Sequence, residues 1–200
     1  MPDAATNAPL KPRPFWQTVI ELAARWYVFI FLNIYGLGKI AGGQFYHRDR
    51  LPEDVANTPL GNATGFDLAW TFMGHSFAYI LFIGLAEVLG AWLLLWNRTK
   101  LLGVAVLLPI MVNILVFDLI FLDKFGALAS ATIYTLLLCV IAICNKDRVR
   151  QAIQGLMGQS QWTQLPRRQK AKLVIGALIL MGLLFGFDQM LVNLFGHGKG

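Results

Sequence analysis

Two carboxylates and an arginine stand inside long apolar runs of this sequence, where a charge is expensive. Glu21 and Arg25 lie four residues apart, so on a helix they share a face and are expected to form a structural ion pair. Glu87 lies in the middle of another apolar run, between Gly84 and Gly90. A charge at the centre of a membrane helix costs about 2.5–3.5 kcal/mol, so each of these residues requires a partner or a role.

Glu87 has two interpretations. As a structural residue it pairs with Arg25 or with a polar neighbour; as a functional residue it is a protonatable group in a buried pocket. It lies about 16 Å along its own run, whereas Lys39 ends the preceding run. With regular helices whose ends are level, a lysine side chain does not span that depth. The sequence therefore predicts no contact between Glu87 and Lys39, with Arg25, Asn33 or Asn113 as the partner of Glu87.

Further polar residues fall toward the same end of the apolar runs as Lys39. Asn113 is expected to hydrogen-bond across helices, and Asp118 to be solvated near the membrane interface, with Lys39 meeting Asp118, Asp188 or water. Polar residues that merely collect near an interface would give the same pattern. We nevertheless predict a polar binding chamber that comprises Lys39, Glu87, Asn113, Asp118 and Asp188.

No motif for a metal or a tightly bound cofactor accompanies these residues. The three histidines and two cysteines do not stand at the spacings of haem, zinc or di-metal ligands. Phosphate-binding, nucleophile-elbow and dinucleotide fingerprints are also missing from any credible context. We therefore expect no metal site, and the sequence assigns no catalytic residue.

The elements that must position the polar residues are five long apolar runs. Of the 200 residues, 56% are hydrophobic and only 14% are charged, which excludes a disordered chain and a soluble nucleic-acid-binding protein. A helix needs about 20 residues to cross about 30 Å of hydrocarbon, and in lipid its backbone must satisfy its own hydrogen bonds. We therefore predict an all-α bundle of membrane helices at about residues 15–38, 76–96, 101–122, 125–144 and 171–195.

The segments between the runs complete the domain organisation. Residues 39–75 are expected to form a long loop, and a stretch near residue 150 is expected to form a short interfacial helix with Ile153, Leu156 and Met157 facing lipid. We divide the chain into a flexible tail (1–14), a four-helix membrane domain (15–148), a basic cytoplasmic connection (149–170) and an additional membrane helix with a short tail (171–200).

The positive charges predict the orientation of the chain. Eleven Lys and Arg residues fall on the side of the N-terminus and five on the other side, while Arg25 lies within the first run. The positive-inside rule then places the N-terminus in the cytoplasm, and the C-terminus and the long loop outside. Topology and anionic lipid thus account for the formal net charge of +6 without nucleic acid as a partner.

Three stretches of the sequence resemble the DoxX-like family of membrane proteins. Residues 26–45 contain an aromatic-Gly-x-x-Lys pattern followed by Gln-Phe, residues 59–99 contain Gly-x-x-Glu-x-x-Gly and an Arg-Thr turn, and the third run contains Met-x-Asn. The resemblance covers residues 20–148 and implies a four-helix bundle, to which the helix at 171–195 is an addition. It points to Lys39, Gln44, Glu87, Arg98 and Asn113 as site residues, and it thereby adds Gln44 as the sixth residue of the predicted chamber.

The resemblance also implies a function. The family is associated with quinone-linked oxidation of thiosulfate or thiols and with membrane-bound redox complexes. By this resemblance the chain is expected to be a membrane subunit of a quinone-linked redox system in the bacterial cytoplasmic (inner) membrane, with a redox partner protein or a small sulfur compound as its partner. Two alternatives stay open: a small-molecule transporter or lipid-binding membrane protein, and a structural assembly factor without catalysis. The sequence leaves open whether the protein is an enzyme.

Overall fold

The computed structural model describes residues 14–122, 125–157 and 165–195, and within these ranges every regular element is a helix. The predicted tail at 1–14 therefore lies, apart from Pro14, outside the described residues. Five helices are long and apolar enough to cross a membrane, so the predicted all-α membrane fold is confirmed and the chain is a multi-pass membrane protein. They are α1 (Phe15–Ile40), α4 (Phe77–Leu95), α5 (Lys100–Phe121), α6 (Phe125–Cys144) and α9 (Arg167–Phe195).

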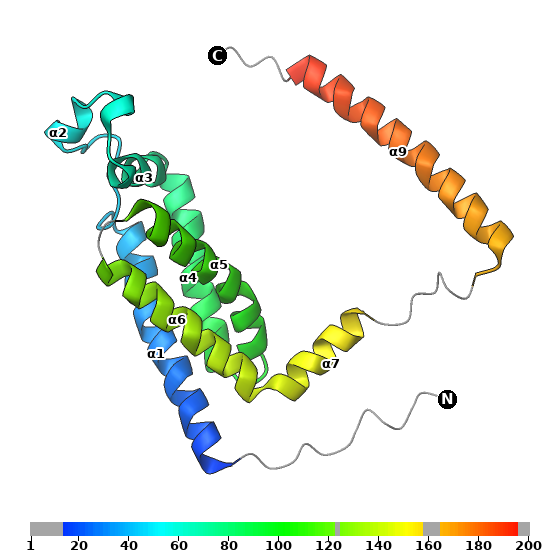
Figure 1. The fold of residues 1–200 in the computed structure, drawn as a ribbon, viewed down its shortest axis with the longest axis horizontal. Coiled ribbons are helices and arrows are strands. Elements are labelled where there is room, and N and C mark those ends of the chain that lie inside the picture. Colours follow the sequence, from blue (N-terminus) through cyan, green and yellow to red (C-terminus); the bar gives the residue numbers. More distant parts are fainter. Residues whose placement is uncertain (1–13, 123–124, 158–164, 196–200) are drawn as a thin grey trace. The chain divides into compact units, whose positions relative to one another are not determined.

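The chain divides into two compact units, Met1–Arg150 and Gln151–Gly200. In the first unit α1 packs against α4 and α6, and α5 packs against the same two helices, so four helices surround one core (Figure 1). The core is apolar and includes the fully buried side chains of Val28, Leu94, Leu107, Leu138 and Ile141. The second unit contains α9, which begins at Arg167, four residues before the predicted start.

The lengths and outer faces of the bundle helices fit a bilayer. The four long helices of the first unit, α1, α4, α5 and α6, have 19 to 26 residues. This corresponds to lengths of about 29–39 Å, which match a hydrocarbon core of about 30 Å. Their outward faces carry large apolar side chains such as Phe82, Leu119 and Leu136. A water-soluble surface does not expose contiguous apolar area on this scale, whereas lipid accommodates it.

Opposed glycines bring α1 and α4 into close contact. A Cβ atom added to Gly36 would lie 2.9 Å from the carbonyl oxygen of Gly84, and one added to Gly84 would lie 2.8 Å from the carbonyl oxygen of Gly36. Gly84 also faces the side chain of Ile40, the last residue of α1. The last turn of α1 is therefore level with Gly84 rather than with the start of α4.

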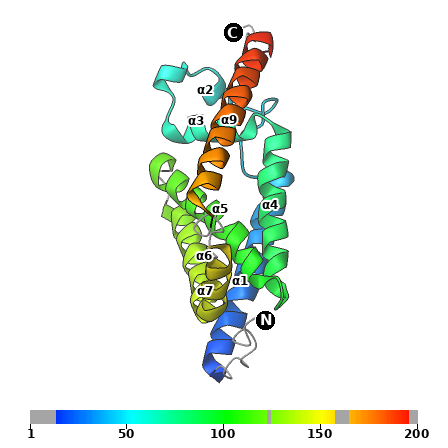
Figure 2. The ribbon, with the colours of Figure 1, turned by 90° about the vertical axis from the view of Figure 1, so that its right-hand side faces the viewer.

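One end of the bundle carries the segment between α1 and α4, and we call it the loop end (Figures 1 and 2). This segment contains α2 (Glu53–Ala56), a 3₁₀ turn η2 (Leu60–Asn62) and α3 (Gly65–Gly74). The prediction of a loop over 39–75 is therefore wrong in part, because α1 continues to Ile40 and because α2, η2 and α3 are helical. Thr64 caps α3 by accepting a 3.1 Å hydrogen bond from the backbone N–H of Asp67.

The opposite end of the bundle carries the short turn between α4 and α5, and we call it the turn end. Helix α7 (Lys146–Leu156) begins directly after α6 and bridges the boundary between the two units. It has the amphipathic character that the sequence predicts, since Ile153, Leu156 and Met157 are exposed beside a polar face.

A buried ion pair between two cavities

Lys39 and Glu87 form a buried ion pair inside the bundle. Lys39 Nζ donates a hydrogen bond to Glu87 Oε1, and both side chains are almost fully shielded. The prediction of no contact is therefore wrong. It assumed that the end of α1 is level with the start of α4, whereas the glycine contact shifts α1 by seven residues, or about 10 Å, along α4. Glu87 is one turn beyond Gly84 and so comes within reach of a lysine side chain.

Glu87 lies at the depth where a membrane helix tolerates charge least. It is ten residues, or about 15 Å, from Phe77 at the start of α4, which is about half of the hydrocarbon thickness. The residue is 0% exposed, and its second oxygen, Oε2, has no hydrogen-bond partner among the described residues. Because leaving a buried polar atom unsatisfied costs about 1–3 kcal/mol, more for a charged group, this oxygen is suited to water, a proton or a ligand.

A large cavity of about 340 Å³ opens beside the pair, and we call it the ligand cavity. Its size falls within the range of about 300–1,000 Å³ that is common for small-molecule sites. Phe82 is 70% exposed and Tyr79 is also exposed, so the cavity reaches the outer surface of the bundle. It is lined by Lys39, Gln44, Phe45, Trp70, Met73, Tyr79, Phe82, Ile83, Ala86, Pro109, Ile110, Asn113, Ile114, Phe117 and Asp118.

A smaller cavity of about 90 Å³ adjoins the ligand cavity and shares part of its lining, and we call it the polar cavity. Glu87 faces this cavity and does not line the ligand cavity. Lys39 and Asp118 line both, so they stand where the two cavities meet. The polar cavity is lined by Leu32, Tyr35, Lys39, Gln44, Trp70, Glu87, Met111, Ile114, Asp118, Ala127, Ser130, Ala131 and Tyr134.

Five of the six residues of the predicted chamber line these two cavities: Lys39, Gln44, Glu87, Asn113 and Asp118. The sixth, Asp188, is exposed on α9 in the second unit. The prediction that Asp118 is solvated at an interface is wrong, because it is only 7% exposed. Helix α3 packs against α5, and its Gly65 lies beside Phe121 at the end of α5, so α3 covers part of that end.

The aromatic and hydroxyl residues of the site were not predicted from the sequence. Trp70 comes from α3, and the pattern Thr64-x-x-Asp67, a helix-start signal, could have identified that helix. Tyr35 lies four residues before Lys39 and therefore on the same face of α1. Ser130 and Tyr134 of α6 share a face in the same way, but no sequence signal shows that this face turns toward Lys39.

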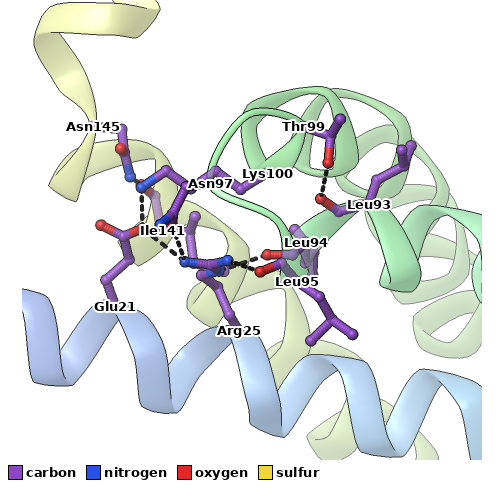
Figure 3. A network of polar contacts seen from close by, with 10 residues as sticks. All are labelled: Glu21, Arg25, Leu93, Leu94, Leu95, Asn97, Thr99, Lys100, Ile141 and Asn145. Atoms are coloured by element: carbon purple, nitrogen blue, oxygen red, sulfur yellow. Dashed lines mark hydrogen bonds and ion pairs between the residues drawn. The ribbon is translucent and has the colours of Figure 1, made fainter.

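A second polar network lies at the turn end of the bundle (Figure 3). The predicted pair of Glu21 and Arg25 is present at 3.7 Å. The Arg25 guanidinium also donates hydrogen bonds to the carbonyl oxygens of Leu94 and Leu95. Arg25 thereby satisfies carbonyl groups at the end of α4, which have no partner within the helix, and it is not the partner of Glu87.

Two more residues of this network were not anticipated. Lys100, the first residue of α5, is buried and donates a hydrogen bond to Glu21 Oε1. Asn145 is also buried, and its amide donates to the carbonyl oxygen of Ile141 at 2.7 Å. The network joins α1 to the turn between α4 and α5, which gives it a structural role. Arg98, to which the family resemblance points, is exposed in that turn.

Comparison with known proteins gives one relevant similarity. The chain is 41% identical over 103 residues to the uncharacterized protein YwoB of Bacillus subtilis (strain 168), and the matched part covers 50% of this chain and 63% of that protein. The match thus spans less than two thirds of the relative, whose name specifies no activity. No family model and no solved structure matches the chain.

Proposed function

We propose that this protein binds the head group of a quinone in the ligand cavity and serves as a membrane subunit of a quinone-linked redox system for a small sulfur or thiol compound. One observation supports the proposal above others. The cavity combines a mostly aromatic and aliphatic wall with the polar side chains of Lys39, Gln44 and Asp118, which also line the polar cavity. A quinone head group has the matching chemistry, since it is a flat apolar ring with carbonyl oxygens that accept hydrogen bonds.

The donors that would bind such a ligand are Lys39 and Gln44. A lysine ammonium carries three N–H donors, and the bond to Glu87 uses one of them. The side-chain amide of Gln44 supplies further donors in the wall of the same cavity. The rings of Phe45 and Trp70, whose centroids are 5.5 Å apart, form part of the apolar wall against which a flat ring can pack.

The chemistry of the proposed role needs protons inside the membrane. A quinone supplies an acceptor for two electrons and two protons, and two thiols that join in a disulfide release the same numbers of each. Lys39 holds a proton at the ligand cavity, and Glu87 fixes the position of the Lys39 ammonium. The surrounding apolar side chains exclude bulk water, which strengthens the hydrogen bonds that Lys39 makes.

The ligand cavity is open toward the surrounding lipid, as the binding of a lipid-soluble molecule requires. Because Phe82 and Tyr79 belong both to the cavity wall and to the exposed surface of α4, a molecule dissolved in the bilayer can enter sideways. We place the protein in the bacterial cytoplasmic membrane with the N-terminus in the cytoplasm, as the charge distribution favours.

A lipid-binding or transport role is the second candidate, and a separate feature favours it. A groove of about 730 Å³ lies at the loop end and shares Tyr79 with the ligand cavity. Its wall is mainly apolar and includes Leu60, Leu68 and Phe72. An elongated lipid could occupy such a groove, which a quinone head group does not require.

Equilibrium binding separates the two candidates. We expect a short-chain quinone to bind saturably to the purified protein in lipid nanodiscs and to quench tryptophan fluorescence. Lys39→Met should weaken this binding about tenfold to a hundredfold, the effect of losing about 1.5–3 kcal/mol of hydrogen bonding to a charged donor. Lys146→Met, which removes an exposed lysine, is the matched control and should leave the affinity unchanged. Binding of phospholipid without saturable binding of quinone would favour the second candidate.

A further inference from the structure

We infer that the polar cavity is a proton-binding site, in which Glu87, Asp118 and Lys39 share one exchangeable proton through bound water. The inference deepens the proposed function, because it names the groups that would supply protons at the ligand cavity. Only this supply of protons to a quinone rests on the proposed function. The site itself can be observed without any ligand.

The site contains more acidic than basic side chains. Among the residues that line either cavity, the charged ones are Lys39, Glu87 and Asp118. One ammonium therefore faces two carboxylates, since Lys39 bonds Glu87 and also interacts electrostatically with Asp118. With all three groups ionised the buried site carries a net charge of −1. A net charge is costly in this apolar setting, and uptake of one proton by a carboxylate removes it.

One carboxylate oxygen of Glu87 lacks a hydrogen bond in the described part of the chain. Oε2 is buried without a hydrogen-bond partner among the described residues, and Glu87 lines the polar cavity. A cavity of about 90 Å³ has room for about three water molecules at about 30 Å³ each. Buried water requires two to four polar partners, and Asp118, Ser130 and Tyr134 provide them on the same wall.

The other groups that face the cavities do not replace the carboxylates as the proton store. Tyr35 of α1 and Tyr134 of α6 line the polar cavity, and Tyr79 of α4 lines the ligand cavity. A phenol O–H donates and accepts hydrogen bonds and adds no charge to the site. Gln44 and Trp70, which complete the wall toward the loop end, do not titrate.

The arrangement of the two cavities gives the proton a route. Glu87 lines only the polar cavity, whereas Lys39 and Asp118 line both. A proton held on Glu87 passes through water to the Asp118 carboxylate and from there to an acceptor oxygen in the ligand cavity. Alternatively, the Lys39 ammonium gives a proton to that acceptor first and is then reprotonated from Glu87. Each transfer breaks one O–H or N–H bond and forms another. The donor becomes more negative by one unit of charge, and the acceptor becomes more positive by one unit.

Infrared difference spectroscopy on ligand-free protein in liposomes tests the inference. As the pH falls, we expect the C=O band of a protonated carboxyl group to appear. Uniform ¹³C labelling of glutamate or of aspartate should shift that band and so identify its source. Glu87→Gln or Asp118→Asn should abolish or displace the band, whereas Asp188→Asn, which changes an exposed aspartate of α9, should preserve it. Because no quinone is present, the result is independent of quinone binding.

Hydroxyl-radical labelling tests the bound water. Met111 is buried and lines the polar cavity, so water in that cavity should make its sulfur reactive. Ser130→Leu, which fills the cavity, should suppress the labelling of Met111. If a variant does not fold, the isotope-labelled wild-type protein still decides the carboxyl assignment. A band that persists unchanged in both carboxyl variants, that responds to sodium instead of pH, or that never appears over the titration would overturn the inference.

Discussion

At the scale of single residues, the Lys39–Glu87 pair dominates the energetics of the site. Removing one partner of a buried ion pair leaves the other charge uncompensated, which costs about 3–5 kcal/mol. We therefore expect Glu87→Gln and Lys39→Met each to lower the free energy of unfolding by about this amount. The double variant contains neither charge and should lose clearly less than the sum of the two single losses. Unfolding by denaturing detergent in mixed micelles measures all three values.

Additive losses in that cycle would show that the two side chains do not interact in the membrane. If Glu87 has only a structural role, the folded fraction of Glu87→Gln should keep any activity of the wild-type protein. If Glu87 takes part in the chemistry, the folded fraction should lose that activity.

The chemistry of individual side chains made much of the site predictable. Charged and amide groups are costly in lipid, and this cost pointed to Lys39, Glu87, Asn113 and Asp118, whereas Gln44 was assigned through the family resemblance. Their pairing was not predictable in the same way. It depends on how far α1 slides along α4, which is set by the contact of two glycine backbones rather than by any property of the charged residues.

At the scale of helices, the glycine contact predicts a sharp difference between neighbouring positions. A Cβ at Gly36 would meet the carbonyl oxygen of Gly84 at 2.9 Å, whereas a Cβ at Gly38 would meet nothing within 4 Å. We expect Gly36→Ala to destabilise the bundle by about 1–3 kcal/mol through overpacking. Gly38→Ala is the matched control and should be neutral or stabilise the helix by up to about 1 kcal/mol. Equal effects of the two changes in thermal unfolding would contradict the register.

The end of α4 provides a second prediction at this scale. Arg25 bonds two backbone carbonyls there, and lysine cannot reproduce the planar fork of the guanidinium. Arg25→Lys should therefore lower the stability by about 1.5–3 kcal/mol. Arg98→Lys changes an exposed arginine nearby and should stay within about 0.5 kcal/mol of the wild type in the same unfolding assay. An unaffected Arg25→Lys protein would show that this network does not hold the turn.

Hydrophobicity made the five long helices predictable, because a run of that length has one stable arrangement in lipid. Helix α3 was not predictable by that argument. It has ten residues, is too short to span, and its position depends on the Thr64 cap and on packing against α4 and α5. The register of α1 against α4 and the packing of α3 on the bundle could therefore be determined only from the three-dimensional structure.

At the scale of the whole molecule, the distribution of Lys and Arg makes a topological prediction. Reporter proteins fused at residue 60 and at residue 157 should report opposite sides of the membrane, with residue 157 in the cytoplasm. The two positions are separated by α4, α5 and α6, an odd number of spans. Reporters on the same side would refute this topology, and a reversed pair would refute the orientation that the positive charges favour.

Photoaffinity labelling tests most directly whether a quinone head group occupies the ligand cavity, as we propose. A short-chain azidoquinone is photolysed with the protein in nanodiscs, and the labelled peptides are identified by mass spectrometry. We predict labels within residues 79–86 and 109–118, which line the cavity, with competition by unlabelled quinone and loss in Lys39→Met. Labels on lipid-facing residues of α6, with no competition by unlabelled quinone, would contradict the account.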